Sequence, residues 1–190
     1  MVFDSAGNLY GTTLEGGVYD AGAVFQLMNT ENGWTENTLQ SFGEQGNNGY
    51  TVAAGLIVDQ SNNLFGATST GGVGNGGTVF ELLQSGGGWS LSLLYSLSGG
   101  LFGPQASLVM DSAGNIYGTT LGDGEYGHGR VFKLAPSNGG WTYTSLHDFT
   151  GGSDGSDPYS AVALDANGNL YGTTYGGGSD GYGVVYEIAP

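Results

Sequence analysis

Residues 111–120 read Asp-Ser-Ala-Gly-Asn-Ile-Tyr-Gly-Thr-Thr, and close variants of this stretch begin at three other aspartates, Asp4, Asp59 and Asp165. The intervals between successive aspartates are 55, 52 and 54 residues. A fixed period of this length is typical of proteins built from stacked structural repeats. We therefore expect one repeat domain over residues 1–190, with units of roughly 54 residues at about 1–52, 53–104 and 105–158 and a partial unit at 159–190.

Each complete unit contains four short runs with the alternation and the β-branched or aromatic content of strands. In the third copy we expect strands at 106–111, 115–120, 129–134 and 141–149, and no sustained helical period occurs anywhere. Four antiparallel strands per repeat are typical of β-propeller blades. The sequence thus predicts an all-β protein of β-propeller blades, either four-bladed or part of a larger propeller; a flat β-solenoid is the competing fold, although its repeats are usually shorter.

The fourth strand of each complete unit begins with a tryptophan. Trp34, Trp89 and Trp141 hold this position, and we interpret them mainly as packing residues that shield the outer strand. The fourth unit has no such strand. An open edge of this kind can pair with another copy, which predicts a homo-oligomer or filament.

The composition excludes several classes of partner. The chain has 17 acidic residues and 2 basic ones, with a net charge of −15, so we expect neither nucleic-acid binding nor attraction to an anionic membrane surface. No apolar stretch is long enough for membrane insertion, and a secretory signal, if one exists, would lie outside this sequence. Only 10% of residues are charged, so the surface is mostly neutral and polar, which suits a neutral glycan.

The repeats resemble the GloVer tandem-repeat family, which is often met in bacterial surface proteins. The resemblance rests on the Gly-Asn-Leu-Tyr-Gly-Thr-Thr core, the following Gly-Gly loop and the Gly-x-Val-Phe-x-Leu strand, and it covers nearly the whole chain. The Asp-x-x-Gly-Asn-Leu-Tyr segment is also similar to NHL-type propeller repeats. The resemblance implies an extracellular or cell-surface location, and it carries no catalytic pattern that transfers to residues of this sequence.

The loops between the second and third strands hold the candidate site residues. In the third copy, Tyr126, His128 and Arg130 lie together with Asp123 and Glu125, a set that can serve acid–base chemistry on a sugar acid; drift among duplicated loops explains the same residues. Aromatic faces on loops can also stack on sugar rings while carboxylates bind the hydroxyls. The candidate ligand-binding residues are Tyr19, Asp20, Tyr126, His128, Arg130, Tyr175, Asp180 and Tyr182.

Carboxylates and side-chain amides at alternate positions, as at Asp165, Asn167 and Asn169, resemble the start of a calcium loop. A hairpin turn in which the aspartate caps backbone amides accounts for the same residues, and we favour that interpretation. Asp154 and Asp157 form a second candidate within an acidic loop. We expect no cofactor, with calcium at these three aspartates as the alternative.

Together these features predict a non-enzymatic extracellular repeat module for surface recognition or assembly, with a neutral polysaccharide or another protein as its ligand. The first alternative is a carbohydrate-active enzyme, a lyase or a hydrolase, that uses the loop of the third copy. The second is a structural protein that assembles through the incomplete unit.

Overall fold

The computed structural model describes residues 1–43, 48–99 and 102–189, which form fifteen strands in four antiparallel sheets. The first sheet contains β1 (Val2–Phe3), β2 (Leu9–Thr13), β3 (Ala23–Thr30) and β4 (Gly33–Ser41). The second contains β5 (Ile57–Val58), β6 (Leu64–Thr68), β7 (Asn75–Ser85) and β8 (Gly88–Ser98). The third contains β9 (Val109–Met110), β10 (Ile116–Thr120), β11 (Arg130–Ser137) and β12 (Gly140–Asp148). The fourth contains β13 (Ala163–Leu164), β14 (Leu170–Thr173) and β15 (Val185–Ile188).

The prediction of an all-β chain with four strands per complete unit is confirmed, and the described residues contain no helix, so none that could span a membrane. In the third unit the strand bounds differ by more than one residue at two places. The first strand of the third unit shortens to Val109–Met110, because only these residues pair with β10. The third strand extends to Ser137 and pairs with β12 up to Gly140, since the hairpin turn lies later than the apolar pattern suggests.

The repeated aspartate forms the turn between the first two strands of each sheet. Asp111 Oδ1 accepts hydrogen bonds from the amides of Ala113 and Asn115, both at 2.9 Å. Its Oδ2 accepts from the side chains of Asn115 at 2.7 Å and Tyr117 at 3.0 Å. Burial alone would raise the pKa of Asp111, but these hydrogen bonds to the charged form lower it overall. Local chemistry thus explains why the Asp-x-x-Gly-Asn-x-Tyr pattern recurs.

A glycine on the second strand lies under an aromatic ring of the third strand. A Cβ added to Gly66 would lie 2.5 Å from Cζ of Phe80, and one added to Gly118 would lie 2.6 Å from Cζ of Phe132. Only a residue without a side chain allows the ring to lie this close to the neighbouring strand. The Gly of the repeated Tyr-Gly-Thr segment is therefore a packing requirement.

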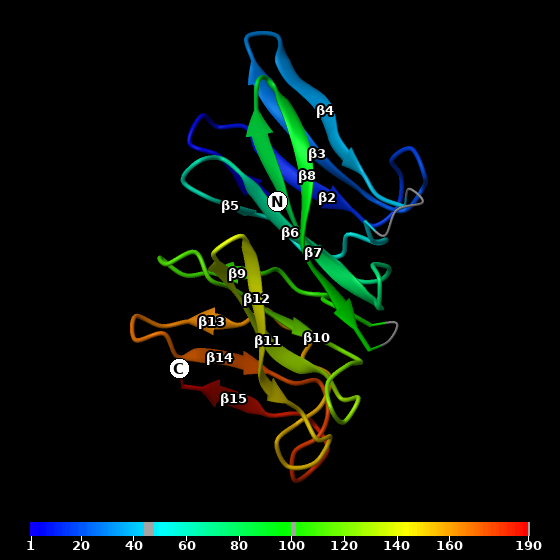
Figure 1. Cartoon of the computed structure of the whole chain (residues 1–190), viewed down its shortest axis with the longest axis vertical. Coiled ribbons are helices and arrows are strands. Elements are labelled where there is room, and N and C mark those ends of the chain that lie inside the picture. The colour runs from blue at the N-terminus through cyan, green and yellow to red at the C-terminus, as the bar shows by residue number, and fades with distance from the viewer. Residues whose placement is uncertain (44–47, 100–101, 190) are drawn as a thin grey trace.

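The apolar core lies at the three junctions between consecutive sheets rather than within one sheet. Tyr10, Val24 and Phe42 of the first sheet pack against Leu64 and Phe80 of the second. Equivalent clusters join the second sheet to the third and the third to the fourth. Figure 1 shows the result: the sheets follow one another in chain order along the longest axis, with the first and the fourth at opposite ends.

Each complete sheet has a β-bulge at the same position of its outer strand. Because of this bulge, the outer strand packs against both the preceding and the following sheet. In the third sheet Val131 pairs with His147 but Phe132 pairs with Ser145, so Leu146 is the extra residue. One extra residue reverses which face the following side chains occupy. Trp141 accordingly packs against Phe65 of the preceding sheet, whereas Phe149 packs against Tyr186 of the following sheet. The same shift occurs between Val24 and Phe25 and between Val79 and Phe80.

The structure agrees with the packing role of two tryptophans and differs at the third. Trp89 packs edge-on against Tyr10, with ring centroids 5.8 Å apart, and Trp141 packs in the same way against Phe65 at 6.4 Å. Trp34 belongs to the first sheet and is 54% exposed. The tryptophan of each unit covers the preceding sheet, and the first sheet has no preceding sheet within this chain.

Candidate functional site

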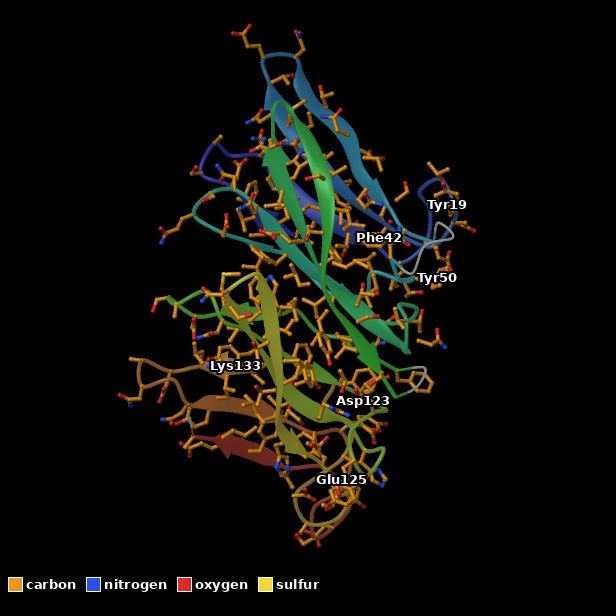
Figure 2. The ribbon with its side chains drawn as sticks, in the orientation of Figure 1. Tyr19, Phe42, Tyr50, Asp123, Glu125 and Lys133 are labelled. Carbon is orange, nitrogen blue, oxygen red and sulfur yellow. The ribbon has the colours of Figure 1, made fainter. Side chains whose placement is uncertain are left out.

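The loops between the second and third strands gather at one side of the molecule, which we call the loop edge and define by residues 14–22, 69–77, 121–129 and 174–183. Figure 2 shows Tyr19, Tyr50 and Glu125 projecting on this side, whereas Lys133 lies away from it. Backbone hydrogen bonds join successive loops through the segment that connects their sheets: the Asp157 amide donates to the His128 carbonyl at 2.9 Å, and the Tyr175 amide donates to the Asp157 carbonyl at 3.0 Å. The edge is therefore one continuous, repeated surface.

A glycine at the same place closes each of the four loops. The amide of Gly77 donates to the Gly71 carbonyl at 3.0 Å, and its φ of 89° lies in the left-handed region. A Cβ on Gly77 would collide with the Thr68 carbonyl oxygen. Gly22, Gly129 and Gly183 hold equivalent positions with φ of 99°, 85° and 88°. These glycines fix the path of the loop and so the direction in which its aromatic residues project.

The four predicted loop tyrosines are all exposed, from 48% at Tyr19 to 91% at Tyr182. Asp20 is also exposed, but its Oδ1 accepts the amide of Gly16 at 2.9 Å, so this carboxylate helps to close its own loop. Asp180 is exposed in the loop of the fourth sheet. The structure places these residues on the loop edge at the first, third and fourth sheets rather than around one cleft.

Three further exposed aromatic residues lie beside the loop edge, in the segments that connect one sheet to the next. They are Tyr50, Phe102 and Tyr159. Tyr159 packs edge-on against Tyr175, with ring centroids 6.1 Å apart. Sequence reasoning missed these residues because they lie between the repeated motifs; the available signal was a lone aromatic in a Gly-, Pro- or Ser-containing linker.

The three residues predicted as a site in the third copy, Tyr126, His128 and Arg130, lie in two different environments. His128 and Tyr126 are exposed on the loop, and the His128 ring lies over Gly151. Arg130, at the start of β11, has only 18% of its side chain exposed, and its Nε lies 3.3 Å from Asp123 Oδ1 and 3.4 Å from Asp148 Oδ1. The Arg130 side chain is thus held by protein carboxylates.

Aromatic packing completes the surroundings of Arg130. Its Nη1 donates to the Tyr143 hydroxyl at 2.9 Å, and Tyr143 stacks on Tyr95 of the second sheet with ring centroids 4.4 Å apart. Burial raises the pKa of Asp123 despite the opposing hydrogen bond from Thr120 and the charge of Arg130. Burial also raises the pKa of Tyr143 to about 12. This cluster joins the second and third sheets, which is a structural role.

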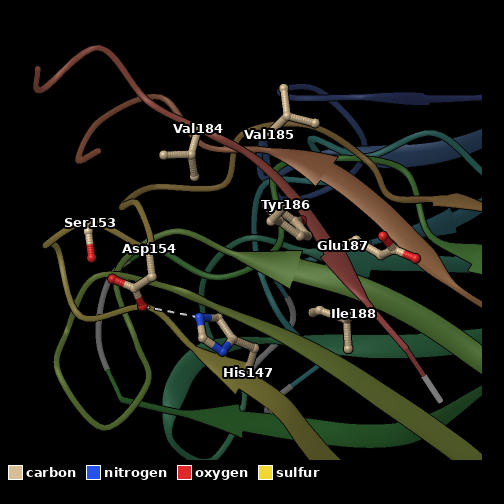
Figure 3. A pocket seen from close by; sticks show the side chains of 8 residues that line it. All are labelled: His147, Ser153, Asp154, Val184, Val185, Tyr186, Glu187 and Ile188. Atoms are coloured by element: carbon tan, nitrogen blue, oxygen red, sulfur yellow. Dashed lines mark hydrogen bonds and ion pairs between the residues drawn. The ribbon is translucent and has the colours of Figure 1, made fainter. Parts of the chain in front are cut away.

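A groove of about 370 Å³ runs beside β15 (Figure 3). His147 of β12 lines it together with Asp154, whose Oδ2 lies 3.1 Å from His147 Nε2. Burial alone would raise the pKa of Asp154, but hydrogen bonds from the side chain and amide of Thr150 and from His147 lower it. The Tyr186 hydroxyl is buried in this region without a hydrogen-bond partner among the described residues, and burial raises its pKa to about 12.

The three calcium candidates each accept hydrogen bonds from their own neighbours in the chain. Asp165 caps its own hairpin, as Asp111 does: Oδ1 accepts the amides of Asn167 and Asn169, both at 2.8 Å. The carboxylate of Asp154 is engaged by Thr150 and His147, and that of Asp157 accepts the Ser156 hydroxyl at 3.0 Å. Over residues 1–43, 48–99 and 102–189, no three His, Cys, Asp or Glu side chains form a group that could hold a metal.

Four antiparallel sheets with the same turn, three of them with the same bulge, are joined by three junctions of the same kind, which defines a tandem-repeat all-β protein. The sequence profile of the Gloeobacter/Verrucomicrobia (GloVer) repeat matches residues 1–186. Because this match covers nearly all of the 190 residues, the chain belongs to the Gloeobacter/Verrucomicrobia repeat family. No curated protein matches it.

Proposed function

We propose that this protein is a non-enzymatic, extracellular repeat module of the propeller type that recognises a neutral polysaccharide through its loop edge. The supporting observation is the row of exposed aromatic side chains that three of the four loops and the segments between the sheets present on this side of the molecule. It comprises Tyr19, Tyr50, Phe102, Tyr126, Tyr159, Tyr175 and Tyr182. Rings presented by rigid loops can stack on sugar rings at little entropic cost.

Charge narrows the class of ligand. The net charge is −15, and the loop edge itself carries Glu15, Asp20, Glu125 and Asp180 as exposed carboxylates. Such a surface repels acidic polysaccharides and phosphate groups. Neutral sugars carry no charge, and their hydroxyls can donate hydrogen bonds to these carboxylates and to loop carbonyls.

Catalysis by the loop of the third copy has less support. It requires Arg130 to bind a substrate carboxylate, yet Asp123 and Asp148 already neutralise its guanidinium. Releasing Arg130 would leave a buried carboxylate unpaired, which costs about 3–5 kcal/mol. If purified protein degrades a polysaccharide and His128→Ala abolishes the turnover, the enzyme interpretation replaces the binding one.

The binding proposal is tested with an array of neutral and acidic polysaccharides, followed by calorimetry on any ligand found. Tyr126→Ala and Tyr182→Ala are each expected to weaken binding about threefold to tenfold, as one lost aromatic contact does. Val73→Ala is the matched control, because Val73 is exposed on the same edge but has no ring. The proposal is contradicted if the protein binds acidic glycans alone, or if both tyrosine variants bind as tightly as the wild type. Binding of a protein ligand instead would favour the alternative that the partner is a protein.

A further inference from the structure

All three junctions of the molecule join the same two kinds of face. We call the face that packs against the preceding sheet the leading face, and the face that packs against the following sheet the trailing face. In the second sheet the leading face consists of Leu64, Phe80, Leu82 and Trp89. It packs against Tyr10, Val24 and Phe42 on the trailing face of the first sheet. Phe42 and Phe80 are in direct contact, with ring centroids 4.9 Å apart.

The leading face of the first sheet is uncovered within this chain. Leu9, Phe25 and Leu27 are equivalent to Leu64, Phe80 and Leu82, which are fully buried, yet all three are only partly buried. Phe3 and Trp34 on the same face are 62% and 54% exposed. Apolar side chains of this size, grouped on one sheet face, are typical of a surface that another protein surface covers.

The trailing face of the fourth sheet is uncovered as well. Val185 is 80% exposed, although its equivalents Val24, Val79 and Val131 are completely buried. Tyr171 lies beside it, at the position that Tyr10 occupies under Trp89. The molecule therefore ends in one unpaired leading face and one unpaired trailing face.

Apart from Phe42, which has no counterpart among the described residues of the three-stranded fourth sheet, these two faces carry the residues that pair at each internal junction. The first and fourth sheets lie at opposite ends of the long axis in Figure 1. One copy in this conformation cannot join its own two end faces. A second copy of this chain offers the complementary face, with most of the aromatic and aliphatic residues that the internal junctions use. Unlike faces that meet in this way form a head-to-tail, heterologous interface.

We propose that copies of this chain associate head to tail, with the leading face of the first sheet of one copy on the trailing face of the fourth sheet of the next. Trp34 then covers Tyr171 of the neighbouring copy as Trp89 covers Tyr10 within the chain. Each added copy leaves a free face of each kind, so assembly continues until a ring closes or a filament grows. This association is independent of the loop edge, which stays accessible along its side.

The test is sedimentation velocity and light scattering over a range of protein concentrations, at an ionic strength high enough to screen the net charge of −15. The wild-type chain is expected to increase in mass with concentration. Trp34→Asp disables the leading face and Val185→Asp the trailing face, so each variant alone is expected to weaken association about tenfold or more. Val73→Asp, an equally exposed apolar residue away from both faces, is expected to behave as wild type.

Mixing the two disabled variants distinguishes head-to-tail association from any symmetric contact. The Trp34→Asp variant keeps its trailing face and the Val185→Asp variant keeps its leading face. The mixture is therefore expected to form a dimer, held by the one intact pair of faces, that does not grow further. Circular dichroism and thermal unfolding check that both variants are folded.

Three results overturn the proposal: a wild-type chain that stays monomeric at all concentrations, association that both substitutions leave unchanged, or a mixture of the two folded variants that stays monomeric.

Discussion

Some features of this fold depend on single residues of the repeated motif, and the loop-closing glycines are the clearest example. Gly77→Ala is expected to lower the free energy of unfolding by about 3 kcal/mol, because it combines a left-handed φ with a clash against a backbone carbonyl. Gly86→Ala is the control. Its φ of 60° is also left-handed, but no atom lies within 4 Å of the added Cβ, so a loss of about 1 kcal/mol is expected. Equal losses in urea unfolding would show that the carbonyl contact is unimportant.

The turn aspartates make stability depend on pH. The pKa of Asp111 is lowered in the folded chain, so its contribution is present above the unfolded pKa, about 3.9, and is lost as pH falls through the folded value. Asp111→Asn is expected to cost about 1–2 kcal/mol at neutral pH and progressively less below about pH 4. Unfolding curves of both proteins at several pH values measure the difference. Asp180→Asn, in an exposed loop, serves as the control, and a cost for Asp111→Asn that stays constant with pH would contradict this account.

At the scale of the strand, the bulge in the outer strand explains the spacing of its apolar residues. Trp89 and Leu97 are eight residues apart and would share a face in a regular strand. The extra residue Leu94 moves Leu97 to the other face, where it packs toward the third sheet. Each outer strand therefore contributes to two junctions.

The tryptophan of the outer strand should matter only where a preceding sheet exists. Trp89→Ala removes an indole that packs on Tyr10, and because Trp89 is only partly buried we expect a loss of about 2 kcal/mol, below the range for a fully buried ring. Trp34→Ala is expected to cost less than about 0.5 kcal/mol in dilute solution. Both values come from chemical denaturation at low concentration. A large loss for Trp34→Ala under those conditions would mean that its exposed face is covered within the monomer.

The same elements show what sequence could and could not predict. The period was predictable because the motif itself repeats, and the turn at each repeated aspartate and the strand order were predictable because they depend on neighbouring segments of the chain. The ion pairs of Arg130 were not predictable. Its partner Asp148 lies on another strand, and whether the two meet depends on strand register. Nor could sequence distinguish Trp34 from Trp89, since their motifs are alike and only the presence of a neighbouring sheet separates them.

At the scale of the whole molecule, charge and packing have opposite effects on the stability of the folded chain. The junctions bury apolar surface, whereas 17 carboxylates and 2 basic side chains give a compact chain that repels itself. The ion pairs of Arg130 relieve this repulsion only at the junction between the second and third sheets. Dissolved salt must supply the remaining screening, both for folding and for any approach of two copies.

Stability should therefore rise with ionic strength. Between about 0.01 M and 1 M salt the screening length falls from about 30 Å to about 3 Å, which weakens repulsion between separate sheets. Each kcal/mol gained raises the Tm of a chain of this size by about 2–4 °C. Measuring the Trp34→Asp variant removes any contribution from association.

Because Asp154, Asp157 and Asp165 each accept hydrogen bonds from their own neighbours, CaCl₂ is expected to act no more strongly than MgCl₂ at equal ionic strength. A larger rise with CaCl₂ that Asp154→Asn or Asp157→Asn abolishes would instead identify a calcium site in the acidic loop between the third and fourth sheets.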